Sequence, residues 1–318
     1  KKKIGVKIFD CKNYSKLNKE IRKFQPDAII HYAEQPSAPY SMAGEREARY
    51  TLQNNLQVTF NTIWAVIENC PKCHIIKIGT MGEYGTPNID IEEGWLNIKH
   101  NNRRDKFLFP RQASSLYHTT KILDTDLLWF YVRYYNLKVT DLMQGPVYGL
   151  ETKESLMSPK LLPNFHYDDI FGTVVNRFLV QAVLGHPLTV YGQGNQKRGY
   201  INLIDSLNCV ELALKNPPKE GMSILNQFTE TFTVNQLAKK IKKAAKNFKI
   251  NVKIKSLKNP RQEKEKHYYN PKFTGLKKLG LKPTLMTEKV LTNMINLVIK
   301  YKKKINQNII LPRVKWNN

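Results

Sequence analysis

The chain has 318 residues, of which 51 are basic and 26 acidic, so its formal net charge is +25. A hydrophobic content of 41% with 10% aromatic residues excludes a disordered chain, and no apolar run reaches the roughly 18 residues that a membrane-spanning helix needs. Four cysteines are too few for a disulfide framework in a chain of about two domains, and the positive charge by itself points to a polyanionic partner.

Strands and helices alternate along the first half of the chain. The expected order is a strand at 4–9, a helix up to Phe24, a strand at 27–33 that is apolar enough to be buried on both faces, a helix at 54–68, a strand at 74–80, a helix at 115–135 and a strand at 138–143. After about Tyr167 a helix at 172–184, an extended segment at 188–191 and mixed basic segments follow. This alternation predicts an α/β fold with a Rossmann-like doubly wound parallel sheet.

We expect two structural parts, with the ligand site in the crevice between them. Residues 1–166 form the sheet domain, and residues 167–318 mainly form a smaller mixed α/β lobe, with segments that return to the sheet. Nucleotide-binding sheets of this class open on a strand, a glycine-rich turn and a helix. Because Gly5 is the only glycine before Asp27, the simplest interpretation is that the first βαβ unit is missing.

Tyr117 and Lys121 lie four residues apart in the helix expected at 115–135. This spacing puts both side chains on one face, about one turn apart. An ammonium group close to a phenol favours the phenolate, so we expect Lys121 to lower the pKa of Tyr117 and make it a base near neutral pH. Thr80 ends the strand expected at 74–80, where a hydroxyl lies at the carboxyl edge of the sheet. The Tyr-x-x-x-Lys spacing often occurs by chance, but Thr80 makes the catalytic interpretation the preferred one.

These residues resemble the extended short-chain dehydrogenase/reductases, which use a Tyr-x-x-x-Lys pair with an upstream serine or threonine. The string from Gly79 to Gly85 is similar to one branch of that group, the UDP-sulfoquinovose synthase family. The segments that carry this resemblance are 31–41, 77–93, 112–118, 188–200, 226–230, 259–261 and 267–270. The resemblance implies that 1–166 is the C-terminal portion of an NAD-binding Rossmann domain and that 167–318 binds a sugar nucleotide.

The resemblance also implies a reaction. Bound NAD oxidises C4 of UDP-glucose, water leaves across C5–C6, sulfite adds at C6 to give UDP-sulfoquinovose for sulfolipid or sulfosugar synthesis, and C4 is reduced again. Tyr117 removes the O4 proton, Lys121 tunes Tyr117, and Thr80 holds the reacting oxygen. Glu83 and His118 are candidates for the proton transfers at C5–C6. For Glu83, a buried structural role is an equal alternative.

The resemblance further assigns binding residues, and it implies no metal site. The candidate cofactor-binding residues are Asp10, Ala33, Glu34, Asn55, Tyr117, Lys121 and Gln144. The candidate substrate-binding residues are Gln35, Arg177, Tyr191, Gln196, Arg198, Tyr200 and Arg261. Arg198 and Arg261 suit a diphosphate, because a guanidinium group binds phosphate through paired hydrogen bonds. A helix cap is an equal alternative for Asn55, and a surface ion pair is an alternative for Arg177.

Some positions depart from related sequences. Met81 and Gly82 stand where related 4,6-dehydratases carry an acid pair, which disfavours an ordinary dehydratase. Pro36 stands where the family has an arginine, and Met143 replaces an asparagine. If sulfite is a substrate, another cation must therefore bind it, and His118 is the candidate.

Cys70, Cys73 and His74 have the Cys-x-x-Cys-His spacing of c-type haem attachment. They join a helix end to a strand of the sheet, and Cys11 and Cys209 do not have the spacing of a second zinc-ligand pair. A chance occurrence is the preferred interpretation, with a redox pair as the alternative.

The positive charge is concentrated towards the C-terminal end. Twenty of the 40 lysines lie between Lys239 and Lys304, whereas residues 25–97 hold four basic and nine acidic side chains. A nucleic-acid-binding surface usually mixes arginine and aromatic residues. The lysines here follow helix-like segments such as 237–246, so we favour a solvated lysine-rich surface over a polyanion site.

The expected partners are UDP-glucose, sulfite or a sulfite-delivering protein, and a second copy of the chain that packs through the helices near 54–68 and 115–135. Neither nucleic acid binding nor a membrane span is expected, and the compartment is the cytoplasm or a plastid stroma. Two other interpretations stay open. One is another UDP-sugar 4-epimerase or dehydratase-type enzyme that uses the same Tyr117 and Lys121 without sulfite. The other is a non-catalytic polyanion-binding protein on the same scaffold.

Overall fold

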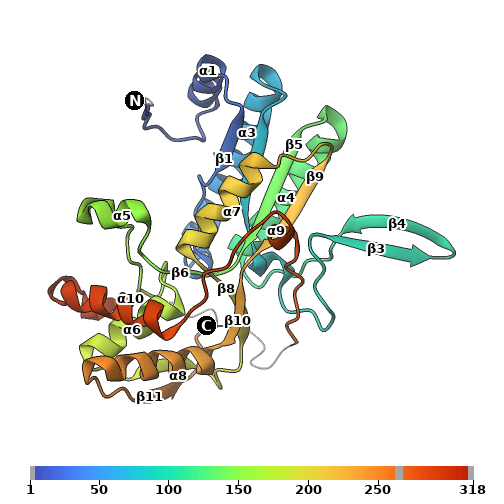
Figure 1. Ribbon diagram of the computed structural model, residues 1–318. Coiled ribbons are helices and arrows are strands. Elements are labelled where there is room, and N and C mark those ends of the chain that lie inside the picture. Colours follow the sequence, from blue (N-terminus) through green and yellow to red (C-terminus); the bar gives the residue numbers. More distant parts are fainter. Residues whose placement is uncertain (1–3, 262–267, 314–318) are drawn as a thin grey trace.

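Four parallel strands form the central sheet of the computed structural model, which describes residues 4–261 and 268–313 (Figure 1). The strand order is β1-β2-β5-β9, and each neighbouring pair is parallel. The bounds are Ala28–His31 for β1, His74–Thr80 for β2, Lys138–Gln144 for β5 and Met222–Gln227 for β9. The predicted α/β fold with a doubly wound parallel sheet is confirmed.

Helices cover both faces of this sheet. On one face lie α3 (Glu45–Asn69) and α4 (Leu116–Tyr135), and on the other lie α7 (Leu203–Lys215) and α9 (Gly275–Lys278). Successive residues of β2 point to opposite faces: Ile75 packs with α3 and α4, while Ile76 and Ile78 pack with α7. The helix α1 (Tyr14–Phe24) packs beside α3.

The strand expected at 4–9 is not formed, and this expectation was wrong. Ile4, Val6 and Ile8 are 74–96% exposed, and their segment has no regular structure. The expectation that 27–33 is buried on both faces was also wrong, because β1 pairs only with β2 in the described residues and Ile30 is 41% exposed. A strand needs a neighbour that satisfies its backbone groups, and an apolar pattern does not reveal whether that neighbour is there.

The other predicted elements are present, and the largest difference is at the start of α3. Ser115 caps α4, so that helix begins where it was expected. The helix expected at 54–68 is the C-terminal part of the longer α3. The helix and the extended segment expected after Tyr167 are α6 (Val174–Leu184) and β7 (Leu188–Tyr191).

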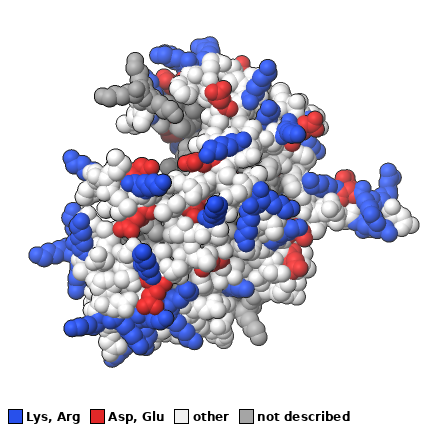
Figure 2. Space-filling view, in the orientation of Figure 1, with Lys and Arg blue, Asp and Glu red and all other residues white. Residues whose placement is uncertain are grey.

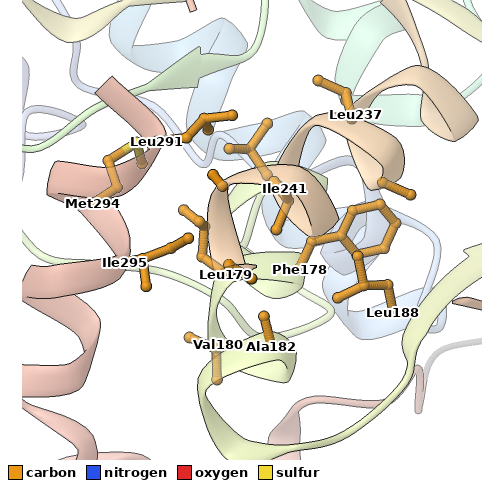
Figure 3. Close-up of a cluster of buried hydrophobic side chains, with 14 of the residues drawn as sticks. Phe178, Leu179, Val180, Ala182, Leu188, Leu237, Ile241, Leu291, Met294 and Ile295 are labelled. Carbon is orange, nitrogen blue, oxygen red and sulfur yellow. The ribbon is translucent and has the colours of Figure 1, made fainter. Parts of the chain in front are cut away.

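A second hydrophobic core lies in the lobe built mainly from the C-terminal half of the chain. Its helices are α6, α8 (Val234–Ala245) and α10 (Glu288–Lys300), packed against β7 and β11 (Ile254–Leu257). Figure 3 shows side chains from the three helices gathered in this core, among them Phe178, Ile241 and Ile295, and each of these three is fully buried. A small sheet joins β10 (Glu230–Thr233) and β8 (Lys197–Asn202) of this half to β6 (Val147–Tyr148), which precedes it in the chain.

Shorter elements complete the described chain. The hairpin of β3 (Trp95–His100) and β4 (Arg103–Leu108) projects from the body of the molecule (Figure 1). The short helices are α2 (Ala38–Ser41), η1 (Met81–Tyr84), α5 (Lys153–Met157), η2 (Pro159–Leu161), η3 (Lys246–Phe248), η4 (Lys302–Lys304) and η5 (Gln307–Ile309). None of the helices in the described ranges has the length and apolar character required to cross a bilayer.

The lysines of α8 lie on the outer face of an amphipathic helix. Its apolar residues, such as Leu237 and Ile241, are buried in the lobe core, whereas Lys242 and Lys243 are exposed. Lys243 pairs with Glu288 of α10 at 2.9 Å. Figure 2 shows basic side chains distributed over the visible face with acidic ones between them, which agrees with a solvated lysine-rich surface.

We expect Phe178→Ala to destabilise the lobe by about 3–5 kcal/mol, because truncation of a fully buried ring loses transfer free energy and leaves a cavity. The free energy of unfolding from urea denaturation measures this loss. Phe171→Ala, at a side chain that is 48% exposed, is the matched control and should change stability by less than about 1 kcal/mol. Equal losses in the two variants would contradict the assignment of Phe178 to the core.

Candidate active site

The carboxyl end of β2 lies against the beginning of α4. Thr80 ends β2, its hydroxyl accepts a hydrogen bond from the Gly82 amide, and the Glu83 carboxylate accepts one from the Thr80 amide, both at 3.2 Å. At the start of α4 the Ser115 hydroxyl accepts from the His118 amide at 3.2 Å. An ideal Cβ on Gly82 would lie 2.3 Å from Nε2 of His118. Only glycine therefore fits at position 82 while the imidazole holds its present place.

Tyr117 and Lys121 lie on successive turns of α4, as expected. The Lys121 Nζ atom is 2.5 Å from Oε1 of Glu34 and 3.8 Å from Oδ2 of Asp124. Burial raises the pKa of the Tyr117 phenol, and the carboxylates of Glu34 and Glu83 raise it further. The lowered Tyr117 pKa that was expected is thus not found in the structure, where the Lys121 ammonium group is paired with the Glu34 carboxylate.

The two carboxylates next to Lys121 differ in pKa. Burial raises the pKa of Glu34, but the charge of Lys121 and the contact with His31 outweigh burial and bring it to about 2. For Asp124, burial and then the charge of Glu34 raise the pKa to about 8. Glu34 is the nearer of the two carboxylates to the Lys121 ammonium group.

A buried lysine that the sequence analysis missed lies beneath Thr80. The Nζ atom of Lys77 donates to the Glu83 carboxylate at 3.2 Å, the Asp141 carboxylate at 3.1 Å, the Thr125 hydroxyl at 2.6 Å and the Lys121 carbonyl at 3.1 Å. The other Glu83 oxygen accepts from Arg111 at 3.2 Å. The sequence signal that could have revealed this network is Lys77 itself, because it is the one lysine or arginine in the buried strand β2.

The position of Glu83 bears on the two roles considered for it. Its side chain has no exposed surface, and both carboxylate oxygens are engaged with Lys77 and Arg111. This arrangement favours the structural alternative, in which Glu83 holds the turn after Thr80 in place.

His118 is held as a neutral imidazole. Burial, and then the nearby positive charges of Arg198 and Arg261, lower its pKa to about 3. Its Nδ1 atom is 3.0 Å from the Ser115 hydroxyl. The idea that His118 itself supplies the cation for sulfite therefore disagrees with the structure, whereas the two arginines beside it carry permanent charge.

Asn55 connects the loop after β1 to α3 and α4 through hydrogen bonds. This side chain is fully buried within α3, accepts from the Gln35 amide at 2.8 Å, and donates to the Gln35 carbonyl at 3.2 Å and to Thr120 at 3.0 Å. The helix-cap alternative for Asn55 was wrong, because α3 begins ten residues earlier at Glu45. Asn55 thereby holds Ala33 and Glu34 in their place beside α4.

The other cofactor candidates lie at two separate positions. Asp10 is exposed, accepts a hydrogen bond from the Lys12 amide at 2.9 Å and pairs with the Lys12 side chain. The nearby carbonyls of Cys11 and Lys12 accept from Asn61 of α3. Gln144 ends β5 and donates to Ser206 at 2.8 Å and to Gln227 at 3.1 Å.

Several substrate candidates gather in the second half of the chain. Arg177, Tyr191 and Arg261 line one pocket, together with Asp169, Gly172, Pro39, Pro260 and Pro312. The Arg177 guanidinium lies 4.2 Å from the centre of the Tyr191 ring and donates to the Thr189 carbonyl at 3.2 Å. Arg177 is 6% exposed, so the surface ion-pair alternative was wrong for it.

The four remaining substrate candidates are not among the residues that line this pocket. Gln196 is buried and donates to the Tyr191 carbonyl at 3.2 Å. Arg198 lies on β8, and its charge acts on His118. Tyr200, also on β8, is packed in the lobe core. Gln35 lies in the other half of the chain, in the loop held by Asn55.

The Cys-x-x-Cys-His sequence has no metal-binding geometry. Burial and then the neighbouring Cys70 raise the pKa of the Cys73 thiol to about 12. The His74 ring lies inside the sheet with Nε2 2.9 Å from the Thr140 hydroxyl. Across 4–261 and 268–313, no group of three metal-binding side chains is found.

The surroundings of Lys121 fit a ligand that carries hydroxyl groups. Three buried polar atoms near the end of β1 lack a hydrogen-bond partner in the described part of the chain: Oε2 of Glu34, Nε2 of His31 and Nε2 of Gln35. Buried polar atoms are normally paired. A ribose, whose two hydroxyls both donate and accept, satisfies a mixed set of this kind beside Tyr117 and Lys121.

The class of protein follows from this site and from a family comparison. The model of the NAD dependent epimerase/dehydratase family matches residues 2–226. The chain belongs to this family, and NAD is its cofactor.

Two relatives are similar over almost the whole chain, and they confirm the resemblance to the UDP-sulfoquinovose synthase branch. The chloroplastic UDP-sulfoquinovose synthase of Spinacia oleracea is 46% identical over 99% of this chain and 66% of that protein. The UDP-sulfoquinovose synthase of Sulfolobus acidocaldarius is 45% identical over 99% of this chain and 82% of that protein. The chain thus spans slightly less than two thirds of the first relative and about four fifths of the second.

Solved structures share the fold. The UDP-glucose 4-epimerase of Thermotoga maritima, solved with UDP-glucose, has a TM-score of 0.71 at 21% identity and covers 93% of this chain and 84% of its own. A dTDP-glucose 4,6-dehydratase of Streptomyces venezuelae, solved with NAD, has a TM-score of 0.70 at 17% identity, with 93% and 80% covered. At these identities the similarity establishes the fold alone.

We expect Lys77→Met to destabilise the protein by about 3–5 kcal/mol, because it leaves the buried carboxylates of Glu83 and Asp141 without their shared cation. Lys77→Met/Asp141→Asn should recover part of the loss, since it removes one of the two uncompensated charges. Urea denaturation measures both. The matched control is the exposed Lys72→Met, and a loss at Lys77 no larger than at Lys72 would contradict the network.

Proposed function

We propose that this protein is an NAD-dependent UDP-sulfoquinovose synthase that converts UDP-glucose and sulfite to UDP-sulfoquinovose. The observation that carries the proposal is the 45–46% identity to two UDP-sulfoquinovose synthases over 99% of the chain. The site geometry supports it: Thr80, Tyr117 and Lys121 lie where a strand end meets a helix start, and Gly82 and His118 are packed together beside them.

Tyr117, Lys121 and Thr80 act on C4 in this proposal. NAD, when bound, supplies reversible hydride transfer at C4. Tyr117 accepts the O4 proton as C4 is oxidised and returns the same proton to O4 when C4 is reduced at the end. Thr80 donates a hydrogen bond to the reacting oxygen from the carboxyl edge of the sheet, and Lys121 fixes the charge near Tyr117.

His118 is the residue that we assign to the proton transfers at C5 and C6. A 4-ketone makes the C5–H bond acidic, and in this proposal the imidazole of His118 accepts that proton. His118 then gives the proton to the C6 hydroxyl, which leaves as water. When the sulfur of bisulfite bonds to C6, the bisulfite proton reaches C5 through the same imidazole. Glu83 acts by holding the turn after Thr80.

The anionic groups bind in the lobe. The pocket lined by Arg177, Tyr191 and Arg261 suits the diphosphate of UDP, because guanidinium groups form paired hydrogen bonds with phosphate oxygens. Arg198 and Arg261 flank His118 with positive charge, so we assign sulfite to their vicinity. This assignment accounts for an active sulfite-using site despite Pro36. We predict that the sulfur donor is either free sulfite or a sulfite-delivering protein. We also predict that the protein acts in the cytoplasm or in a plastid stroma.

We also propose a homodimer that packs through α3 and α4. Their outer face carries large apolar side chains, and Phe60, Phe130, Tyr134 and Tyr135 are 41–68% exposed. The rings form one connected cluster with Trp64 and Tyr131. An apolar patch of this kind on helices marks an association surface.

We expect the protein, supplied with NAD, UDP-glucose and sulfite, to form UDP-sulfoquinovose, which mass spectrometry detects as a sulfonated nucleotide sugar. Tyr117→Phe should lower the rate at least about 100-fold, because the phenol is the only group assigned to the O4 proton. Tyr301→Phe, at the C-terminal end of α10, is the matched control. Sulfite-independent formation of UDP-galactose with no sulfonated product would favour a 4-epimerase instead, and steeply salt-dependent nucleic acid binding without NAD binding would favour a non-catalytic protein.

We expect Phe130→Glu to convert a dimer to a monomer in sedimentation velocity, because a buried unpaired carboxylate is costly at an apolar interface. The thermal midpoint of the monomeric variant serves as the check on folding. Phe107→Glu, at a similarly exposed ring of the β3–β4 hairpin, should leave the dimer intact. A monomeric wild-type protein would disprove the proposed interface.

A further inference from the structure

The pocket that we assign to the diphosphate carries a carboxylate on one side. Asp169 lines it together with Arg177, Tyr191 and Arg261, and the Asp169 side chain is only 5% exposed. Burial raises the pKa of the Tyr191 phenol, and the charges of Arg177 and Arg261 lower it. The Asp169 carboxylate acts on the same phenol and raises this pKa. A carboxylate in this place opposes the binding of a phosphate group, because like charges repel strongly where solvent screens them little.

The turn that carries Asp169 keeps the carboxylate in this place. Oδ1 of Asp168 accepts from the Ile170 amide at 2.8 Å, and the Asp168 carbonyl accepts from the Gly172 amide at 3.1 Å. An ideal Cβ on Gly172 would lie 2.3 Å from that carbonyl oxygen, so a larger residue does not fit while the turn keeps its shape. The Ser37 hydroxyl, at the start of α2, donates to the Ile170 carbonyl at 2.5 Å. Moving Asp169 away from a bound anion would therefore break several hydrogen bonds.

Residues 310–313 supply a counter-ion instead. Ile310 is buried in the lobe core, and Pro312 lines the pocket. The Arg313 amide donates to Oδ2 of Asp169 at 2.6 Å, and the Arg313 guanidinium donates to Oδ1 from Nε at 3.1 Å and from Nη2 at 2.9 Å. One arginine thus engages both oxygens of a carboxylate that lies 144 positions earlier in the chain. Paired hydrogen bonds of this kind are the strong form of an ion pair.

We propose that Arg313 is a positioning residue for the nucleotide: it neutralises Asp169, so that this carboxylate does not cancel the attraction of Arg177 and Arg261 for the diphosphate. The inference rests on the proposed function and adds a residue to its substrate site. The described residues that line the pocket include Pro312 but not Arg313, whose side chain is 54% exposed. Arg313 therefore acts on the ligand through Asp169 and not by direct contact.

The test compares two ligands that differ only in the diphosphate. NMR titration in the presence of NAD measures the Kd of UDP and the Kd of uridine for the wild type and for Arg313→Gln. We expect Arg313→Gln to weaken UDP binding about tenfold and to change uridine binding by less than about twofold, because the uncompensated carboxylate repels only the charged group. Equal weakening of both ligands would show a purely structural role and would overturn the inference.

A second variant tests whether Arg313 acts through Asp169. Asp169→Asn/Arg313→Gln should bind UDP within about twofold of the wild type, because no carboxylate remains to be neutralised. If thermal melting shows that Arg313→Gln alone does not fold, the comparison of Asp169→Asn with the double variant replaces it, and the two should bind UDP equally. A further loss of UDP affinity caused by Arg313→Gln in the Asp169→Asn protein would contradict a role through Asp169.

Two controls separate this local charge from the general attraction of a basic protein for an anion. Lys304→Gln removes one positive charge from an exposed position on η4 and should leave the Kd of UDP unchanged. Arg313→Lys keeps the charge without the paired geometry and should retain most of the UDP affinity.

The two possible failures are distinguishable. A wild-type protein that binds no UDP would disprove the proposed function, and this inference with it. Unchanged UDP affinity in a folded Arg313→Gln, when the wild type does bind UDP, would overturn the inference alone.

Discussion

The ammonium group of Lys77 is the constraint on which the site depends. It is fully buried and satisfied by groups from three other elements, namely η1, α4 and β5. A buried charge without such partners is strongly unfavourable, so these elements pack only in the arrangement that brings Glu83, Thr125 and Asp141 to the same ammonium group. Thr80 precedes η1, and Tyr117 lies at the start of α4. The network therefore determines how the strand end and the helix start meet.

Burial has the largest effect on the pKa of each of two candidate catalytic groups in this arrangement, Tyr117 and His118. Burial, and then the carboxylates of Glu34 and Glu83, raise the pKa of the Tyr117 phenol. His118 is neutral because partial burial, and then the charges of Arg198 and Arg261, lower its pKa. In the proposed reaction the neutral imidazole moves protons, and the arginines, which hold their charge at any physiological pH, bind anions. In this proposal His118 transfers protons and Arg198 and Arg261 bind anions, although all three are basic residues.

The high net charge of the chain has a different origin from the site. Its lysines concentrate on the outer faces of helices such as α8, whose inner faces form the lobe core. The cations that face the candidate site include buried or partly buried arginines and lysines, among them Arg177, Arg198 and Lys121. Net charge describes the surface and its solubility, whereas binding depends on a few cations that the fold places in a pocket.

The sequence by itself determined the order of most elements, the parallel sheet and the placement of Tyr117 and Lys121 on successive turns of one helix. Hydrophobic periodicity and the spacing of Tyr117 and Lys121 are local patterns, which are visible in the sequence without knowledge of the fold. It also carried the family resemblance, through the string from Gly79 to Gly85. Only the tertiary structure decided that residues 4–9 form no strand and that Glu34 meets Lys121 across 87 positions of the chain. It also decided that His118 takes the space beside Gly82. The physical reason is that strand pairing, burial and charge compensation depend on contacts between distant segments, which no local pattern of residues contains.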